Sequence, residues 1–248
     1  MLVGKLAEKT AFITGGTSGI GEFTAKALAN DGAKVAVAGR DEEDGKRIVE
    51  EIQQAGGEAV FVRLDITDKA SITESVKQAI DSFGNIDILF NGAGIHDSYD
   101  TVLDTDEESY DLLMDINVKG PFLMTKEVLP MMLEKGKGTI INVGSQATFV
   151  AGPGGSAYVT SKHALEGFTK QLAYDFGKKG IKANLIAPGF IETPMTEGIE
   201  DERLKDIPAQ RAGKPEEVAA VAVFLASDES DYIQGTSIKV DGGWTVGR

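Results

Sequence analysis

The chain has 248 residues, a formal net charge of −14 and no cysteine. A surface this acidic repels nucleic acid and anionic membranes, and the lack of cysteine excludes disulfides and thiolate catalysis. No apolar run approaches the roughly 18 residues of a membrane span, and the first residues are too polar for a signal peptide. We therefore expect a cytoplasmic protein that binds neither nucleic acid nor membrane. His96 and His163 do not stand at a metal-motif spacing, so no metal site is expected.

Short apolar runs alternate with longer amphipathic segments along the whole chain. The runs are rich in Val, Ile and Phe and mostly uninterrupted, as in strands that are buried on both faces. Strands are predicted at 10–14, 34–38, 59–64, 86–90, 139–143, 182–186 and 237–240.

Helices are predicted between these strands. One spans 41–55, and a second spans 68–83 with Thr67 as its cap and Gly84 at its end. The stretch 106–135 contains Pro121 and Pro130, so a kink or break is expected there. Strand–helix alternation predicts an α/β fold: a Rossmann-type, doubly wound parallel sheet of about seven strands, with helices on both faces. Without a linker or composition break, residues 1–248 are interpreted as a single domain.

A glycine-rich turn follows the first strand and opens the first helix. Gly15 permits the tight turn, Gly19 lets the backbone approach a pyrophosphate, and Gly21 lets the helix pack closely. The amide groups at the helix N-terminus then favour the anion. This turn predicts a dinucleotide site.

The residues that end the second and third strands bear on the choice of dinucleotide. An NAD site places Asp or Glu where this chain has Gly39, and the following Arg40 suits the 2′-phosphate of NADPH. Asp41 could instead pair with Arg40, so NADPH is favoured and NADH is the alternative. Asp65 either accepts from the adenine amino group or opens the next helix. After the fourth strand, Asn91 can brace a turn whose small residues admit a ribose.

Tyr158 and Lys162 stand one helical turn apart, so the phenol and the ammonium share a helix face. A nearby lysine charge lowers the pKa of a tyrosine, which suits a proton shuttle. Ser145 ends the strand at 139–143 and is expected nearby.

Taken together, these residues resemble the classical short-chain dehydrogenase/reductase family over almost the whole chain. The match rests on residues 14–21, Asp65, 91–94, Asn117, Ser145, Tyr158, Lys162, 188–189 and the tail from Val240. The resemblance implies that Tyr158 exchanges a proton with the substrate oxygen, which Ser145 also holds. It implies that Lys162 lowers the pKa of Tyr158 and binds the nicotinamide ribose, and that Asn117 holds a water in a proton relay.

The resemblance also supplies the remaining site residues. The expected cofactor contacts are Gly15, Thr17, Ser18, Gly19, Ile20, Gly21, Arg40, Asp65, Ile66, Asn91, Ala93, Gly94, Tyr158, Lys162, Pro188, Gly189, Ile191 and Thr193. The candidate substrate contacts are His96, Ser145, Gln146, Tyr158 and Phe190, with Tyr99 and Phe149 nearby. The segment at about 190–212 is expected to close over the substrate as a lid. A homotetramer is also implied.

The implied activity is NADPH-dependent reduction of a small carbonyl compound, reversible as alcohol oxidation. One alternative is a 3-oxoacyl thioester reductase acting on acyl carrier protein, since Lys178 and Lys179 are expected near the active-site entrance. An acidic enzyme meets an acidic carrier poorly, which favours a free substrate. The alternative from another class is a non-catalytic protein that senses NADPH, but such a protein needs no proton relay.

Overall fold

The computed structural model describes residues 4–199 and 201–247, which contain one parallel sheet of seven strands. The sheet has the order β3-β2-β1-β4-β5-β6-β7, and every neighbouring pair is parallel. The strands are β1 (Thr10–Thr14), β2 (Lys34–Gly39), β3 (Glu58–Arg63), β4 (Ile88–Asn91), β5 (Gly138–Val143), β6 (Ile181–Pro188) and β7 (Ser237–Val240). The predicted Rossmann-type sheet is confirmed, and each predicted strand end lies within two residues of the observed one.

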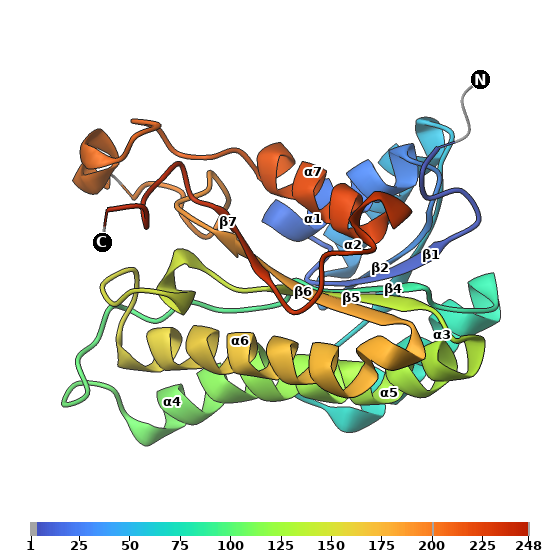
Figure 1. The fold of residues 1–248 in the computed structure, drawn as a ribbon, viewed down its shortest axis with the longest axis horizontal. Coiled ribbons are helices and arrows are strands. Elements are labelled where there is room, and N and C mark those ends of the chain that lie inside the picture. Colours follow the sequence, from blue (N-terminus) through green and yellow to red (C-terminus); the bar gives the residue numbers. More distant parts are fainter. Residues whose placement is uncertain (1–3, 200, 248) are drawn as a thin grey trace.

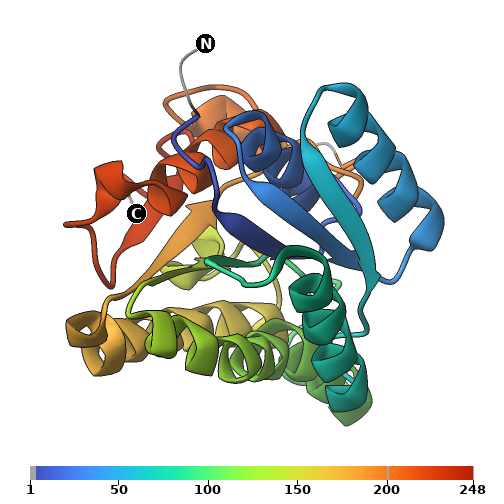
Figure 2. The same cartoon turned by 90° about the vertical axis from the view of Figure 1, so that its right-hand side faces the viewer.

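Helices cover both faces of the sheet (Figures 1 and 2). One face carries α1 (Gly19–Asn30), α2 (Glu42–Gln54) and α7 (Pro215–Ala226); the other carries α3 (Lys69–Phe83), α4 (Glu107–Met114), α5 (Gly120–Lys135) and α6 (Ser156–Phe176). Among the helices of the described residues, none is both long and apolar enough to cross a bilayer.

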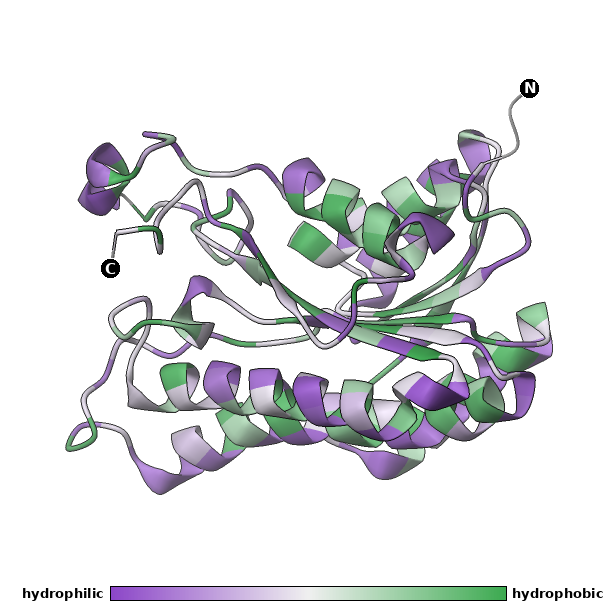
Figure 3. Ribbon diagram, in the orientation of Figure 1, coloured by the Kyte–Doolittle hydropathy of each residue, from purple (hydrophilic) through white to green (hydrophobic). Residues whose placement is uncertain are grey.

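Each face of the sheet has its own apolar core. Neighbouring residues of a strand point to opposite faces, so Phe12 packs with α5 residues such as Met124, while Ile13 packs with α1 residues such as Leu28. The strands are therefore apolar over most of their length, whereas many polar residues lie on the outer helices and loops (Figure 3). This double burial explains the uninterrupted apolar runs in the sequence.

Two helix predictions need correction. Thr67 does not cap α3: its hydroxyl donates to Asp65 at 2.7 Å, and Asp68 caps the helix by accepting from the N–H of Ala70 at 2.9 Å. The prolines do not break the stretch 106–135. Pro121 directly follows the π-helical segment, and the helix continues through Pro121 and Pro130. The irregularity precedes both prolines, as a π-helical segment at Asp115–Lys119.

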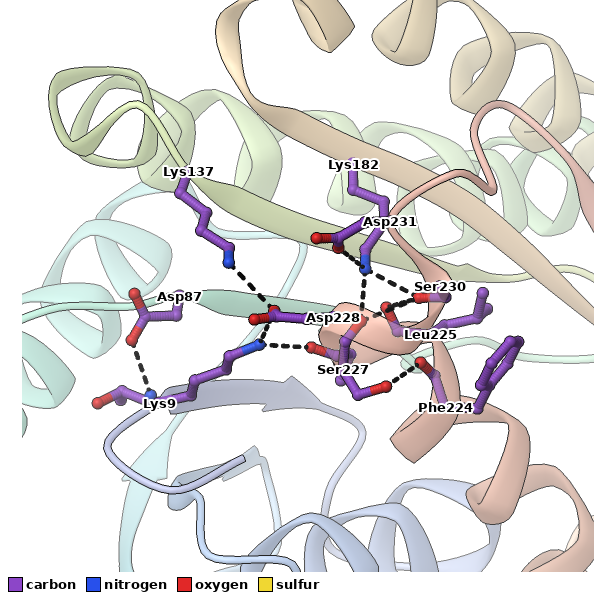
Figure 4. Close-up of polar contacts among 12 residues, drawn as sticks. Lys9, Asp87, Lys137, Lys182, Phe224, Leu225, Ser227, Asp228, Ser230 and Asp231 are labelled. Atoms are coloured by element: carbon purple, nitrogen blue, oxygen red, sulfur yellow. Dashed lines mark hydrogen bonds and ion pairs between the residues drawn. The ribbon is translucent and has the colours of Figure 1, made fainter. Parts of the chain in front are cut away.

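The amino edge of the sheet is fastened to the segment after α7 by ion pairs (Figure 4). The ammonium of Lys182, on β6, donates to the Ser227 carbonyl, the Ser230 hydroxyl and the Asp231 carboxylate at 2.7, 2.8 and 2.9 Å. These three acceptors match the three N–H groups of a buried lysine. Asp228 accepts from Lys9 at 2.8 Å and also from Lys137 at 3.1 Å. These bonds lie at the amino ends of the strands and leave the carboxyl ends uncovered.

Candidate active site

A cavity of about 750 Å³ lies at the carboxyl ends of β1, β4, β5 and β6. In a doubly wound sheet this edge, where the strand order reverses between β1 and β4, is the usual ligand position. The cavity is lined by the glycine-rich turn, the turn after β4, the start of α6 and the segment after β6.

The glycine turn after β1 is packed too closely for side chains. Gly15 has φ +66°, and a methyl group on it would lie 2.8 Å from the backbone nitrogen of Ala93. A methyl group on Gly21 would lie 2.0 Å from the carbonyl oxygen of Gly15. Ser18 precedes α1 but makes no side-chain capping bond, so it does not consume the first amides of the helix. The turn therefore fits a pyrophosphate.

At the end of β2, Gly39 occupies the position where an NAD site has the carboxylate that binds the ribose 2′-hydroxyl. A Cβ on Gly39 would lie 2.6 Å from the Thr17 methyl group and 2.8 Å from its hydroxyl. Asp41 is engaged elsewhere, because it caps α2 by accepting from Asp44 at 3.0 Å. Within the described residues, the exposed Arg40 has no ion-pair partner. The ion pair between Asp41 and Arg40 that the sequence allowed is therefore not formed, and the Arg40 guanidinium can bind a phosphate.

Two predicted cofactor residues have other duties. One carboxylate oxygen of Asp65 accepts from the N–H and hydroxyl of Thr67 at 3.0 and 2.7 Å, and its contact with the adenine stays a prediction. Asn91 does not brace its own turn; it is buried and donates to Asn142 on β5 at 2.8 Å. The brace is Thr14, whose hydroxyl accepts from the N–H groups of Gly92 and Ala93, both at 3.1 Å. Only its place at the end of β1 could have indicated this role.

Tyr158, Lys162 and Ser145 meet inside the cavity as predicted. Tyr158 and Lys162 lie on the same face of α6, with the ammonium 5.5 Å from the centre of the phenol ring. The ammonium donates to the carbonyl of Val143 at 3.0 Å. Ser145 follows β5 and opens a short 3-10 turn at Gln146–Thr148. All three side chains are more than nine-tenths buried.

Burial dominates the protonation of this group. It raises the pKa of Tyr158 to about 12, although a side-chain hydrogen bond with Ser145 acts in the opposite direction. Burial also lowers the pKa of Lys162 to about 8. Desolvation is the largest influence on the pKa of Tyr158 in the chain alone, and the lowering of this pKa by Lys162 stays a prediction. A phenol that keeps its proton at neutral pH is suited to donating it.

Asn117 lies in the π-helical segment and holds the backbone beside the cavity. Its amide accepts from the N–H of Ile95 at 2.9 Å and donates to the Ile95 carbonyl at 2.9 Å. It also donates to Ser161 at 3.2 Å. A Cβ on Gly94 would lie 3.2 Å from the Asn117 oxygen and 3.6 Å from the Lys162 ammonium. Asn117 thus holds the backbone of Ile95, which lines the cavity close to Lys162.

Two residues of the loop after β4, His96 and Asp97, contact the start of α6. The His96 ring lies 4.2 Å from the Tyr158 ring, centre to centre, and its nitrogens face the carbonyls of Asp97 and Pro153. The Asp97 carboxylate accepts from the N–H groups of Gly155 at 2.7 Å and Tyr158 at 2.9 Å. Sequence reasoning missed Asp97, because nothing local marks a cap that comes from a distant loop.

Backbone hydrogen bonds join the start of the predicted lid to the residue that follows its end. The N–H of Gly213 donates to Phe190, and that of Glu192 donates to Gly213, both at 2.9 Å. Thr193 lies against the glycine turn, 3.4 Å from where a Cβ of Gly19 would be. Further along the segment, the Arg203 guanidinium donates to the carbonyl of Gly152 at 3.1 Å. The segment therefore lies over the cavity and contacts both of its walls.

Most predicted site residues come together at this cavity. Its lining includes the predicted residues Gly15, Ser18, Gly19, Ile20, Gly21, Ala93, Gly94, His96, Ser145, Gln146, Tyr158, Lys162, Pro188, Gly189, Phe190, Ile191 and Thr193. Five predicted cofactor residues lie outside it: Thr17, Arg40, Asp65, Ile66 and Asn91. Asn117 supports it from below.

Some expectations about the surroundings are wrong. Phe149 packs with Leu185 and Leu165 and does not line the cavity. Lys178 and Lys179 follow the C-terminus of α6, whose 21 residues span about 30 Å from the end that carries Tyr158. They lie at the far edge of the sheet and do not flank the entrance of the same chain.

Known proteins with this arrangement are similar over nearly the full length. The family described as enoyl-(acyl carrier protein) reductase matches residues 15–245. The 2,5-dichloro-2,5-cyclohexadiene-1,4-diol dehydrogenase LinX of Sphingobium indicum is 38% identical, covering 99% of this chain and 100% of its own. The 3-oxoacyl-(acyl-carrier-protein) reductase FabG of Thermotoga maritima is 39% identical, covering 98% of this chain and 100% of its own. The chain belongs to the short-chain dehydrogenase/reductase family.

A solved structure of the same fold bears on the cofactor. A putative NAD(P) dependent gluconate 5-dehydrogenase from Beutenbergia cavernae, with bound NADP, superposes with a TM-score of 0.91 at 33% identity. The match covers 97% of this chain and 98% of that one. The protein is accordingly an NAD(P)-dependent oxidoreductase of the short-chain dehydrogenase/reductase family.

Proposed function

We propose that the protein is an NADPH-preferring reductase of a small, free carbonyl compound, working reversibly as an alcohol dehydrogenase. The observation that carries this proposal is the meeting of Tyr158, Ser145 and Lys162 in a cavity closed on one side by the glycine turn. When bound there, NADPH supplies the hydride. The residues of the chain then position the carbonyl and supply the proton.

The catalytic residues share the work of the reaction in this proposal. Ser145 holds the carbonyl oxygen and Tyr158, protonated at neutral pH, gives it a proton as the carbonyl becomes an alcohol. Lys162 binds the nicotinamide ribose, and its remaining charge assists the phenol. Asn117 fixes the backbone at Ile95 and thereby the depth of the site. As the family resemblance implies, it also holds a water that returns a proton through Lys162.

The preference for NADPH rests on the end of β2. Thr17 leaves no room for a carboxylate at Gly39, and Arg40 has no ion-pair partner among the described residues. A guanidinium binds a 2′-phosphate through charge-assisted hydrogen bonds, whereas a 2′-hydroxyl offers it little. The bound NADP of the gluconate 5-dehydrogenase is in keeping with this.

The second candidate is a 3-oxoacyl-(acyl carrier protein) reductase, which the similarity to FabG favours. Within one chain, Lys178 and Lys179 are too far from the site to receive a carrier protein there, which argues against it. The net charge of −14 also repels an acidic carrier. LinX and the gluconate 5-dehydrogenase are named for free small alcohols, which supports the first candidate.

Initial rates of NADPH and NADH oxidation by the purified protein test the proposal. The panel contains small diketones, aryl ketones, keto sugars and a 3-oxoacyl thioester. Turnover of a free ketone with NADPH ahead supports it, and turnover of the thioester alone replaces it with the second candidate. Tyr158→Phe is expected to lower turnover by about a thousandfold or more while NADPH binding stays within a few-fold. Unchanged biological effect of this variant would instead favour a non-catalytic sensor.

We also propose that the enzyme forms a homotetramer in the cytoplasm. Apolar side chains of α4 and α5 are exposed, among them Leu112 and Phe122 at 50% and 47%, and Tyr174 on α6 is 84% exposed. Such side chains are typical of faces that a second copy covers. Light scattering coupled to gel filtration measures the mass; a monomer at micromolar concentration would refute the proposal.

A further inference from the structure

Arg203, in the predicted lid, bonds to parts of the chain that are distant from it in the sequence. Its guanidinium donates to the Asp201 carboxylate at 2.7 and 2.8 Å, within the lid itself. It also donates to the carbonyl of Gly152, in the loop before α6, at 3.1 Å. It lies 5.0 Å from the centre of the Trp244 ring, in the C-terminal tail. One side chain therefore joins the lid to the opposite wall of the cavity and to the tail.

Tyr99, in the loop after β4, is a further partner of Arg203. The hydrogen bond with Asp201 is the main cause that raises the pKa of Arg203, and a hydrogen bond with Tyr99 also raises it. Tyr99 has φ +64°, in the left-handed region that destabilises a residue with a bulky side chain. Its N–H donates to the Asp97 carboxylate at 3.2 Å, and its ring lies 4.8 Å from the His96 ring. These contacts hold Tyr99 in the strained conformation that meets Arg203.

The Arg203 contacts lie at the mouth of the cavity. Arg203 and Tyr99 both line the cavity, yet the Arg203 side chain is 41% exposed and Tyr99 is 46% exposed. Residues that line a cavity and also face solvent mark its mouth. The paired Asp201 side chain lines the cavity too and is only 4% exposed. The bonds from Arg203 to Tyr99 and Gly152 therefore cross the mouth.

The C-terminal tail gives Arg203 a fixed surface. The Asp241 carboxylate accepts from the N–H and the hydroxyl of Thr245 at 3.0 and 2.6 Å, which folds the tail into a compact turn. The N–H of Ala209 donates to the Gly242 carbonyl at 3.0 Å and so fastens the last part of the lid to this turn. Trp244, within the turn, is 3% exposed. Arg203 thus rests on a ring whose own position is fixed.

We propose that Arg203 is a latch that holds residues 201–206 across the mouth of the cavity. The latch consists of its contacts with Gly152, Tyr99 and the Trp244 ring. When it opens, residues 201–206 move away from the tail and uncover the Trp244 ring, while the ends of the lid stay fixed at residues 190–192 and 209–213. Substrate entry and product release require this opening. The inference concerns access to the cavity and holds for any substrate that the site reduces.

Trp244 is the only tryptophan of the chain, so its fluorescence reports on the latch. Acrylamide quenches a tryptophan that solvent reaches far more than a buried one. Arg203→Met keeps an unbranched side chain but has neither a charge nor a hydrogen-bond donor. We expect the acrylamide quenching constant of Trp244 to rise about threefold or more in this variant, because a charge-assisted hydrogen bond and a cation–π contact are lost. Lys205→Met, an equal change of charge on the same turn, is the control and should match the wild type.

Arg203→Met also leaves the buried Asp201 carboxylate without this partner, which destabilises the turn on its own account. Asp201→Asn combined with Arg203→Met removes that charge, and the same rise in quenching is expected. Tyr99→Phe, which keeps the ring and removes only the hydroxyl, is expected to give a smaller rise. Quenching equal to that of the wild type in folded Arg203→Met and in the double variant would overturn the latch.

Turnover gives a second measurement. With a ketone that the wild type reduces, Arg203→Met and the double variant are expected to raise KM by about fivefold or more and to change kcat by less than about threefold, because the closed lid is less populated. Raised quenching with unchanged KM and kcat would show that the contact does not govern access, and would overturn the inference. The quenching measurement needs no substrate, so it decides on the latch even where every ketone fails and the proposed function falls.

Discussion

The carboxylate of Asp97 accepts a hydrogen bond from the backbone N–H of Tyr158 at 2.9 Å, across 61 residues of sequence. The same carboxylate accepts from Gly155, so it caps α6 at the turn that carries the phenol. Its negative charge also helps to raise the pKa of Tyr158, after burial. Asp97 thus positions Tyr158 and adds to the effect of burial on its pKa.

Asp97→Asn is expected to move the pH profile of alcohol oxidation toward lower pH. Oxidation needs the phenolate, and removal of a nearby negative charge makes the phenolate easier to form. The weaker cap is expected to cost about 1 kcal/mol of stability. Rates measured from pH 6 to pH 10 test the shift. Asp100→Asn, with the same change of charge on the same loop, serves as the control and should leave the profile in place.

Lys162→Met is expected to remove a pH dependence of stability. Burial lowers the pKa of Lys162 from 10.5 to about 8, so between these values the folded protein binds fewer protons than the unfolded chain. Stability therefore rises with pH across that window. The unfolding free energy of the wild type minus that of the variant should increase by on the order of 2 kcal/mol from pH 7.5 to pH 9.5. Urea unfolding at both pH values measures this; a constant difference would contradict it.

Gly21→Ala is expected to weaken NADPH binding by about tenfold or more and to cost about 1–3 kcal/mol, because the added methyl group meets the Gly15 carbonyl. Gly167→Ala is the matched control. Gly167 lies exposed within α6 with nothing near its Cβ position, so alanine should stabilise by about 0.5–1 kcal/mol. Thermal unfolding and NADPH fluorescence titration distinguish the two. Equal stability and equal NADPH affinity of the two variants would show that the turn accommodates a methyl group at Gly21.

Arg40→Leu is expected to lower kcat/KM with NADPH by about tenfold to a hundredfold and to change that with NADH by less than about twofold. Arg63 lies opposite Gly39 in the register of β3 and is the competing cation. Arg63→Leu is therefore assayed in parallel. A larger loss of NADPH activity in that variant would assign the phosphate to Arg63 instead.

The sheet could be predicted from the sequence because each strand is buried on both faces and reads as an apolar run. The positions of Tyr158, Lys162 and Ser145 followed from helix spacing and a strand end. Pairings between distant segments could not be predicted: Asp97 caps α6, and Thr14 braces the turn after β4. Lys178 follows the C-terminus of α6, and the length of that helix, which no local pattern reveals, separates it from Tyr158. Thr67 and Asp68 were competing neighbouring caps, and only the hydroxyl bond to Asp65 decides between them.

The backbone bonds that join Phe190, Glu192 and Gly213 have a consequence for protein engineering. Because the two ends of the segment between them are fixed side by side, its length and composition can change without moving β6 or α7. Residues 193–212 can therefore be exchanged as a cassette between related enzymes, while the glycine turn, the proton donor and the apolar cores stay untouched. The part of the cavity wall that this stretch supplies can therefore be varied separately from the part supplied by the loop after β4 and the turn after β5.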